Sequence, residues 1–174
     1  MKERYNGSNL DLIREKTIFF DANILIYLFW PVPGRKEPEL YASIFSKLLS
    51  NNQTFVTSPV VLSEVINRIL RIDWDNLTKK KVVFKTFRDS EEGQEAQSDL
   101  NEIIKGKILP NFKIVDTIYD NEKVKELLSV DSIDFNDKMI VNQCLENDYI
   151  LLTHDKDFKD STVDILSMNT ELCS

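Results

Sequence analysis

Several acidic side chains stand where this sequence could carry out chemistry. The stretch "TIFFDAN" places an apolar run directly before Asp21, and Asn23 follows two positions later. Asp155 comes just after a second apolar run, "YILLT". Asp137 lies in the first turn of the helical pattern that precedes this second run. We expect the three carboxylates to meet if the two apolar runs are neighbouring strands of one sheet.

A fourth carboxylate comes from the helical pattern that follows Ser58. Ser58 is a typical N-cap and Pro59 suits the first helical position. Glu64 lies in the second turn, on the flank of the stripe that the apolar residues of this helix form. Its position is consistent with the same sheet edge without demanding it. Arg68 shares this flank and is a candidate RNA contact.

Four carboxylates at one edge would repel one another, so some would hold protons unless a cation neutralised them. Mg²⁺ and Mn²⁺ prefer oxygen ligands at about 2.1 Å. Paired ions of this kind can activate a water and stabilise a phosphodiester displacement. His154 is the single histidine, so a catalytic or metal site must rest mainly on carboxylates. The set therefore predicts metal-assisted phosphodiester hydrolysis.

Each acid taken alone has a simpler explanation. Asp21 could cap a helix, and Asp137 could be a first-turn acid that the helix dipole favours. Glu64 alone would be a solvated helix residue, while Asp155 and Asp157 would be loop residues. The convergence of several acids on one predicted edge favours a shared site over coincidence.

The elements that must position these acids alternate along the chain. Short apolar strands are predicted at 17–20, 54–57, 111–116 and 149–153, with a candidate fifth at 163–167. Helical patterns lie between them. This alternation is typical of a mainly parallel sheet of four to five short strands with helices on both faces. In such sheets, ligands bind beyond the carboxyl ends of the strands.

One segment does not fit the simple alternation. Residues 74–109 read as a polar helical insertion, interrupted near 88–93. It carries the best basic patch of the chain, which includes Lys79, Lys80 and Lys81. These lysines are candidate RNA contacts, although a solvated helix face is the simpler interpretation. The insertion could also be a partner surface or a lid.

Length and composition favour a single globular domain over 1–174. The net charge of −7 and the pI of about 4.8 argue against nucleic-acid binding by bulk electrostatics. No apolar run approaches the roughly 18 residues that a membrane span requires. The polar N-terminus does not resemble a signal peptide. Cys144 and Cys173 lack metal or redox spacing, so we expect a reducing cytoplasm.

Three segments resemble the motifs of the PIN nuclease family. "IFFDANILIYL" is similar to the opening strand with Asp-x-Asn, and "SPVVLSEVINRI" to the helix that carries the second acid. "DFNDKMIVNQCLENDYILLTHDKDF" resembles the third and fourth motifs, an Asp that opens a helix and a later Thr-x-Asp. The motifs come in the family's order over 17–158. Together they are specific, whereas any one would be weak.

The resemblance implies a three-layer α/β/α fold and a Mg²⁺- or Mn²⁺-dependent nuclease, usually acting on RNA. It assigns the acidic, metal-binding roles to Asp21, Glu64, Asp137 and Asp155. It implies that Asn23 and Thr153 orient ligands, water or phosphate. Many small members are VapC-type toxins, often dimeric, which a cognate antitoxin holds inactive. We therefore expect an RNA substrate, an antitoxin partner and a homodimer as hypotheses for this chain.

Three features depart from the family pattern. The 73 positions between Glu64 and Asp137 are more than compact toxins have. Asp134 lies three positions before Asp137, and either could be the ligand; we favour Asp137 because the expected apolar pair follows it. Asp134 and Asp157 are then supporting residues. His154 fills a variable position of Thr-x-Asp, where an exposed loop residue is expected more than a substrate contact.

Two other functions compete with the nuclease. One is a catalytically silent PIN scaffold that binds protein or RNA, although intact acids argue against a silent site. The other is a receiver-like phosphotransferase with Asp21 as the phosphorylated nucleophile. The usual phosphatase signature has a second Asp two positions later, where Asn23 stands instead.

Overall fold

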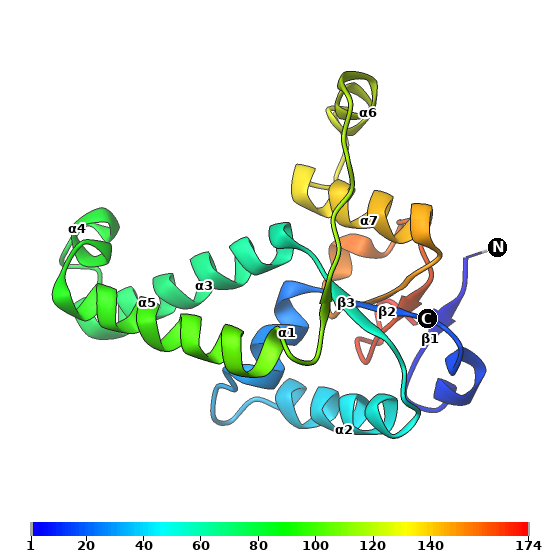
Figure 1. Cartoon of the computed structure of the whole chain (residues 1–174), viewed down its shortest axis with the longest axis horizontal. Helices are drawn as coiled ribbons and strands as arrows, with labels where there is room; N and C mark the ends of the chain where they lie inside the picture. The colour runs from blue at the N-terminus through cyan, green and yellow to red at the C-terminus, as the bar shows by residue number, and fades with distance from the viewer. Residues whose placement is uncertain (1, 174) are drawn as a thin grey trace.

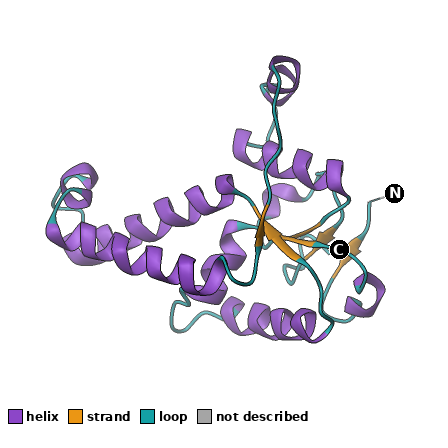
Figure 2. Cartoon of the chain, in the orientation of Figure 1, coloured by secondary structure: helices purple, strands orange, loops and turns teal. Residues whose placement is uncertain are grey.

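A six-stranded parallel sheet forms the centre of the molecule (Figures 1 and 2). The computed structural model describes residues 2–173. The order of the strands is β1-β6-β5-β2-β3-β4, and every described pair is parallel. The strands are β1 (Arg4–Tyr5), β2 (Ile18–Phe20), β3 (Phe55–Thr57), β4 (Lys113–Ile114), β5 (Ile150–Leu152) and β6 (Ile165–Leu166).

Strand β2 lies at the middle of the sheet, as its uninterrupted apolar sequence predicts. Ile18 pairs with Phe55 of β3 on one side and with Ile150 of β5 on the other. All residues of β2, β3 and β5 are buried, which is typical of parallel strands covered on both faces. The carboxyl ends of β2 and β5 therefore lie side by side. Asp21 follows the first strand and Thr153 follows the second.

Helices cover both faces of the sheet, with α7 on one side and α1 and α2 on the other (Figure 1). The three-layer α/β/α arrangement is thus confirmed. The α-helices are α1 (Ala22–Phe29), α2 (Glu37–Ser50), α3 (Pro59–Thr78), α4 (Phe84–Arg88), α5 (Glu91–Ile103), α6 (Asn121–Leu127) and α7 (Phe135–Asn147). Two 3₁₀ turns, η1 (Leu10–Ile13) and η3 (Lys156–Phe158), and a π-helical segment, η2 (Ile104–Ile108), complete the elements.

The sheet has one strand more than the four to five predicted. Strand β1 pairs with β6 through Arg4 and Ile165, and the backbone N–H of Glu3 donates a 2.8 Å hydrogen bond to Asp164 Oδ1. A strand of two residues has no hydrophobic alternation to detect, so the polar start of the chain gave no signal. This strand closes the edge of the sheet that lies beside β6.

Aromatic side chains fill the core on the α2 side. Phe20 of β2 meets Phe45, Phe55 and Phe112 edge-on, with ring centroids 4.9 to 5.9 Å apart. Such edge-to-face pairs are worth about 0.5–1.5 kcal/mol each beyond the burial of their area. This cluster fixes the end of β2 immediately before Asp21.

The helical insertion is confirmed, but it grows out of α3 rather than starting as a separate element. Helix α3 continues unbroken to Thr78, and Lys79 ends it in the left-handed conformation with φ of 51°. Helix α5 then returns alongside α3, and α4 lies at their far end (Figure 1). The insertion is not polar all round, because Phe87 of α4, Leu100 of α5 and Ile104 of η2 are buried. Within residues 2–173, no helix is long and apolar enough to cross a membrane.

Candidate active site

Asp21 is the most deeply buried of the predicted acids, with 4% of its surface exposed. It ends β2 and caps α1, since its Oδ1 accepts a 2.6 Å hydrogen bond from the backbone N–H of Ala22. Its Oδ2 accepts hydrogen bonds from Asn23 Nδ2 and from Thr153 Oγ1, both at 2.7 Å. Asp21 therefore caps α1 and is also held by one side chain from that helix, Asn23, and one from the end of β5, Thr153.

Asn23 and Thr153 connect this acid to the loop after β5. The backbone N–H of His154 donates to Asn23 Oδ1 at 3.1 Å, and that of Asp155 donates to Thr153 Oγ1 at 3.0 Å. Both side chains are buried. The structure thus brings together Asp21, Asn23 and Thr153, and it attaches the start of the Asp155 loop to them.

Asp155 is half-buried and begins the 3₁₀ turn η3. Its Oδ1 accepts a 3.1 Å hydrogen bond from the backbone N–H of Asp157, which leaves Oδ2 without a hydrogen bond from η3. Asp157 itself is exposed, and its side chain takes no part in the network around Asp21. Its contribution here is the backbone N–H that fixes Asp155.

The two acids at the start of α7 have different positions. Asp134 is exposed and caps the helix, accepting a 2.9 Å hydrogen bond from the backbone N–H of Asp137. Asp137 is half-buried. Burial raises the pKa of Asp137 to about 8, and the charge of Asp134 adds to this shift. The three other predicted acids contribute further in the same direction, in the order Asp21, Asp155, Glu64.

Glu64 reaches the same group of charges from α3. It is half-buried and pairs with Arg68 one turn later, with 3.1 Å between Glu64 Oε1 and an Arg68 guanidinium nitrogen. Burial raises the pKa of Asp21 to about 6, the Thr153 hydrogen bond opposes the rise, and the charge of Glu64 adds to it. The acids predicted from four separate elements therefore lie within electrostatic reach of one another.

The donor set suits a hard divalent cation, because all four acids offer oxygen and two of them have raised pKa values. Within residues 2–173, no three acidic, histidine or cysteine side chains already form a cage for a metal. Mg²⁺ keeps several waters and commonly takes only one or two carboxylates together with substrate phosphates. The arrangement fits such an open site better than a closed structural one.

His154 differs from the exposed loop residue that was expected. It is half-buried, and its Nδ1 lies 2.9 Å from the hydroxyl of Tyr41 on α2. The Tyr41 hydroxyl also accepts a 3.0 Å hydrogen bond from the backbone N–H of Met168. Tyr41 is fully buried, so this contact ties the loop that carries Asp155 to the core. Sequence spacing gives no sign of it.

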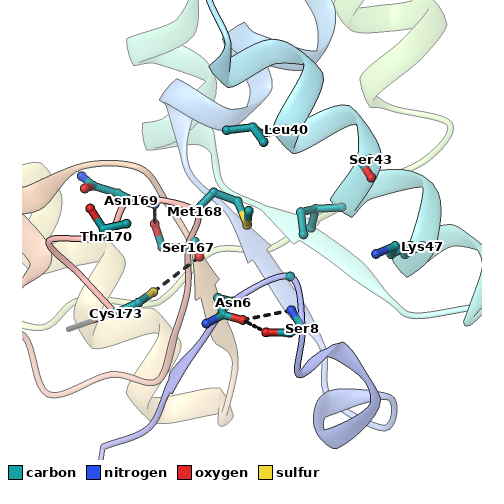
Figure 3. Close-up of a pocket in the computed structure, with 12 residues that line it drawn as sticks. Asn6, Ser8, Leu40, Ser43, Lys47, Ser167, Met168, Asn169, Thr170 and Cys173 are labelled. Carbon is teal, nitrogen blue, oxygen red and sulfur yellow. Dashed lines mark hydrogen bonds between the residues drawn. The ribbon is translucent and has the colours of Figure 1, made fainter.

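A hollow of about 630 Å³ is lined by none of the four acids. It lies between α2, the loop after β1 and the C-terminal segment (Figure 3). Its polar groups mostly bond to one another: Ser8 donates to Asn6, and the backbone N–H of Asn169 donates to Ser167 Oγ. Two smaller hollows lie beside Asn23 and Arg68 instead.

The predicted basic patch lies away from the acids. Lys79 follows Glu64 by 15 positions, which places it about 22 Å along the axis of α3. Lys79, Lys80 and Lys81 are exposed, and Lys80 pairs with Asp75 at 3.5 Å. The patch therefore forms the far tip of the insertion, whereas Arg68 lies beside the site.

The chain resembles known proteins in its sequence and in its fold. The sequence model of the PIN domain matches residues 18–162, which is most of the chain. A search of curated protein sequences finds no match. Among solved structures, the chain is similar to VapBC2 from Rickettsia felis, which was solved bound to a DNA fragment from the VapBC2 promoter. The TM-score is 0.51 and the sequence identity 18%, over 87% of this chain and 98% of that chain. FitAcB from Neisseria gonorrhoeae gives a TM-score of 0.55 and 16% identity over 86% of this chain and 96% of that one.

The fold defines a parallel α/β protein with acidic residues just after two of its central strands, Asp21 after β2 and Asp155 after β5. The chain belongs to the PIN domain family. Members of this family are in general nucleases.

Proposed function

We propose that this protein is a Mg²⁺- or Mn²⁺-dependent endoribonuclease with Asp21, Glu64, Asp137 and Asp155 as its catalytic, metal-binding acids. The observation that supports this most is the group of carboxylates from four elements at the carboxyl edge of the sheet, where burial and the charges of neighbouring acids raise the pKa of Asp21 and of Asp137. Membership of the PIN family supports the nuclease class. RNA as the substrate follows from the family resemblance of the motifs.

The chain's own residues prepare the site in distinct ways. Asp21 accepts three hydrogen bonds, one at Oδ1 and two at Oδ2, which leaves about one of its roughly four lone-pair positions unused, on Oδ1. Asn23 and Thr153 fix the direction of that open position. Asp137, whose pKa is about 8, holds a proton at neutral pH, and it would give up this proton if it served as a ligand of a bound cation. A bound divalent cation would activate a water and stabilise the charge that develops on the phosphate.

The decisive experiment is cleavage of RNA by the purified protein with Mg²⁺, with Mn²⁺ and with a chelator. We expect cleavage with either metal, none with the chelator, and loss of at least about 10³-fold in rate for Asp21→Asn. Asp89→Asn is the matched control, since this exposed aspartate at the α4–α5 corner lies outside the site. Equal cleavage by wild type and Asp21→Asn would contradict the proposal. Absence of Mn²⁺ binding in calorimetry would instead support the alternative of a catalytically silent scaffold that binds protein or RNA.

We further propose that this nuclease is the toxin of a toxin–antitoxin pair, acting in the cytoplasm as a homodimer. The support is the resemblance of its motifs to VapC-type toxins, and the fold it shares with VapBC2 is consistent with that. Induced expression should arrest growth, Asp21→Asn should remove the arrest, and co-expression of the neighbouring reading frame should relieve it. Growth unaffected by wild-type expression would contradict the toxin role, while light scattering would report the dimer.

A further inference from the structure

Two adjoining hollows lie beside the acids and share three lining residues, Asn23, Tyr27 and Arg68. The first is open, about 270 Å³ in volume, and runs past Asp155 and Lys156. The second is more enclosed, about 140 Å³, and extends toward Trp30 and Arg35. The open hollow reaches Asp155, whereas the enclosed hollow is lined by none of the four predicted catalytic acids. None of the roles assigned above accounts for the second hollow.

The enclosed hollow has the walls that a planar ring would need. Tyr27 and Trp30 give it aromatic surface, and Ile26, Val32 and Ile72 give it aliphatic surface. Tyr27 is held in place because it stacks on Tyr41 at 5.7 Å with an interplanar angle of 16°. It also meets His154 edge-on at 5.8 Å. A fixed aromatic ring loses little entropy when a ligand packs against it.

Positive charge gathers at these two hollows in a protein whose net charge is −7. Arg35 and Arg68 line the enclosed hollow, while Lys156 lines the open one. One guanidinium nitrogen of Arg68 pairs with Glu64, which leaves its other donors for a ligand. Arg35 lies in the exposed loop between α1 and α2. Aromatic rings next to arginines are the usual means of holding unstacked bases of single-stranded RNA.

We propose that the enclosed hollow between Tyr27, Trp30 and Arg35 binds one unpaired nucleobase of the RNA, adjacent to the phosphate that the acids act on. The open hollow then carries the sugar–phosphate backbone past Lys156 and Asp155. This inference rests on the proposed ribonuclease function. It makes Tyr27 and Arg35 specificity-determining residues, and it requires the base at that position to be unpaired, because a base inside a duplex cannot enter the pocket.

The test measures binding rather than cleavage, using Asp21→Asn protein with Mg²⁺ and short fluorescent single-stranded oligoribonucleotides. A series of oligonucleotides carries one abasic nucleotide at each successive position. We expect one position at which loss of the base weakens binding about tenfold or more. In Tyr27→Leu and in Arg35→Gln, binding of the intact oligonucleotide should weaken. Removal of the base at that position should then have little further effect on binding, because the protein substitution and the missing base remove the same contact.

Two matched controls accompany these variants. Lys36→Gln removes the same charge from the neighbouring position of the same loop. In this variant, the abasic nucleotide should weaken binding as much as it does in the parent protein. Tyr27→Phe preserves the ring that stacks on Tyr41, so it should keep the position-dependent effect of the abasic nucleotide that Tyr27→Leu removes. Urea unfolding checks that Tyr27→Leu still folds, and Arg35→Gln provides the same test at an exposed position.

Distinct results would overturn the pocket and the function. An abasic penalty that is uniform along the oligonucleotide, or that persists in both Tyr27→Leu and Arg35→Gln, overturns the nucleobase pocket even where wild-type protein cleaves RNA. Wild-type protein that neither binds nor cleaves any RNA in the presence of Mg²⁺ or Mn²⁺ overturns the ribonuclease function, and the pocket with it.

Discussion

Thr153 Oγ1 donates a 2.7 Å hydrogen bond to Asp21 Oδ2, although the two residues lie 132 positions apart in the sequence. The same oxygen accepts the backbone N–H of Asp155 at 3.0 Å. One buried hydroxyl therefore links the strand end that carries the first acid to the loop that carries the last. Strands β2 and β5 are paired in parallel, and this hydroxyl holds the residues that follow them. It therefore helps to set the position of Asp155 relative to Asp21.

Replacing this hydroxyl by a methyl group should disturb both acids. In Thr153→Val we expect the free energy of unfolding to fall by about 1–3 kcal/mol, because the Asp155 N–H loses its partner inside the protein. Affinity for Mn²⁺ should also fall, because Asp21 loses one of the donors that orient it. Urea unfolding and calorimetry measure the two effects. Thr153→Ser keeps the hydroxyl and should restore Mn²⁺ affinity; a Thr153→Val protein that binds Mn²⁺ like wild type would contradict the positioning role.

Stability without metal should decrease as pH rises from about 4 to about 8. Folding raises the pKa of Asp21 to about 6 and that of Asp137 to about 8, from 3.8. In this window the native state binds more protons than the unfolded state, so the free energy of unfolding falls with increasing pH. Asp137→Asn should match wild type near pH 4.5 and be the more stable protein at pH 8.5. Urea unfolding in chelator at both pH values measures this difference, and a difference that does not change with pH would refute the assignment.

Metal binding should release protons at pH 6.5. Asp137 is then largely protonated, and a cation at the site displaces its proton. Calorimetry of Mn²⁺ binding in two buffers of different ionisation enthalpy gives the number of protons released. We expect about one proton fewer for Asp137→Asn than for wild type. The same count for both proteins would mean that Asp137 stays outside the metal site.

The corner between α4 and α5 should depend on Gly93. A Cβ at this position would lie 2.0 Å from the carbonyl oxygen of Phe87, so the backbone would have to shift. We expect Gly93→Ala to lower the free energy of unfolding by about 2 kcal/mol or more. Gly106 is the matched control, because a Cβ there meets no atom within 4 Å. Fluorescence of Trp74, whose indole N–H donates to the Val82 carbonyl at 2.6 Å, reports on this corner during unfolding.

The sequence predicted the features that depend on local pattern. The end of β2 just before Asp21, the Ser58 cap of α3 and the helix with Asp137 in its first turn all follow from hydrophobic period and capping chemistry. Contacts between distant segments left no such pattern. Tyr41 lies 113 positions from His154, and their hydrogen bond depends on how α2 packs against the end of β5. The two hollows beside Tyr27 depend likewise on the packing of separate elements, so motif matching missed them.

The tip of the insertion should act on long RNA and not on chemistry. Lys79, Lys80 and Lys81 are exposed about 22 Å along α3 from Glu64, beyond the reach of a short oligonucleotide bound at the acids. Replacing all three by alanine should leave the single-turnover rate on a short oligonucleotide unchanged. Binding of a long single-stranded RNA should weaken, and the slope of log affinity against log salt should drop by about 2, since each phosphate contact on a single strand contributes about 0.7. An unchanged salt slope for the long RNA would show that these lysines form only a solvated helix end.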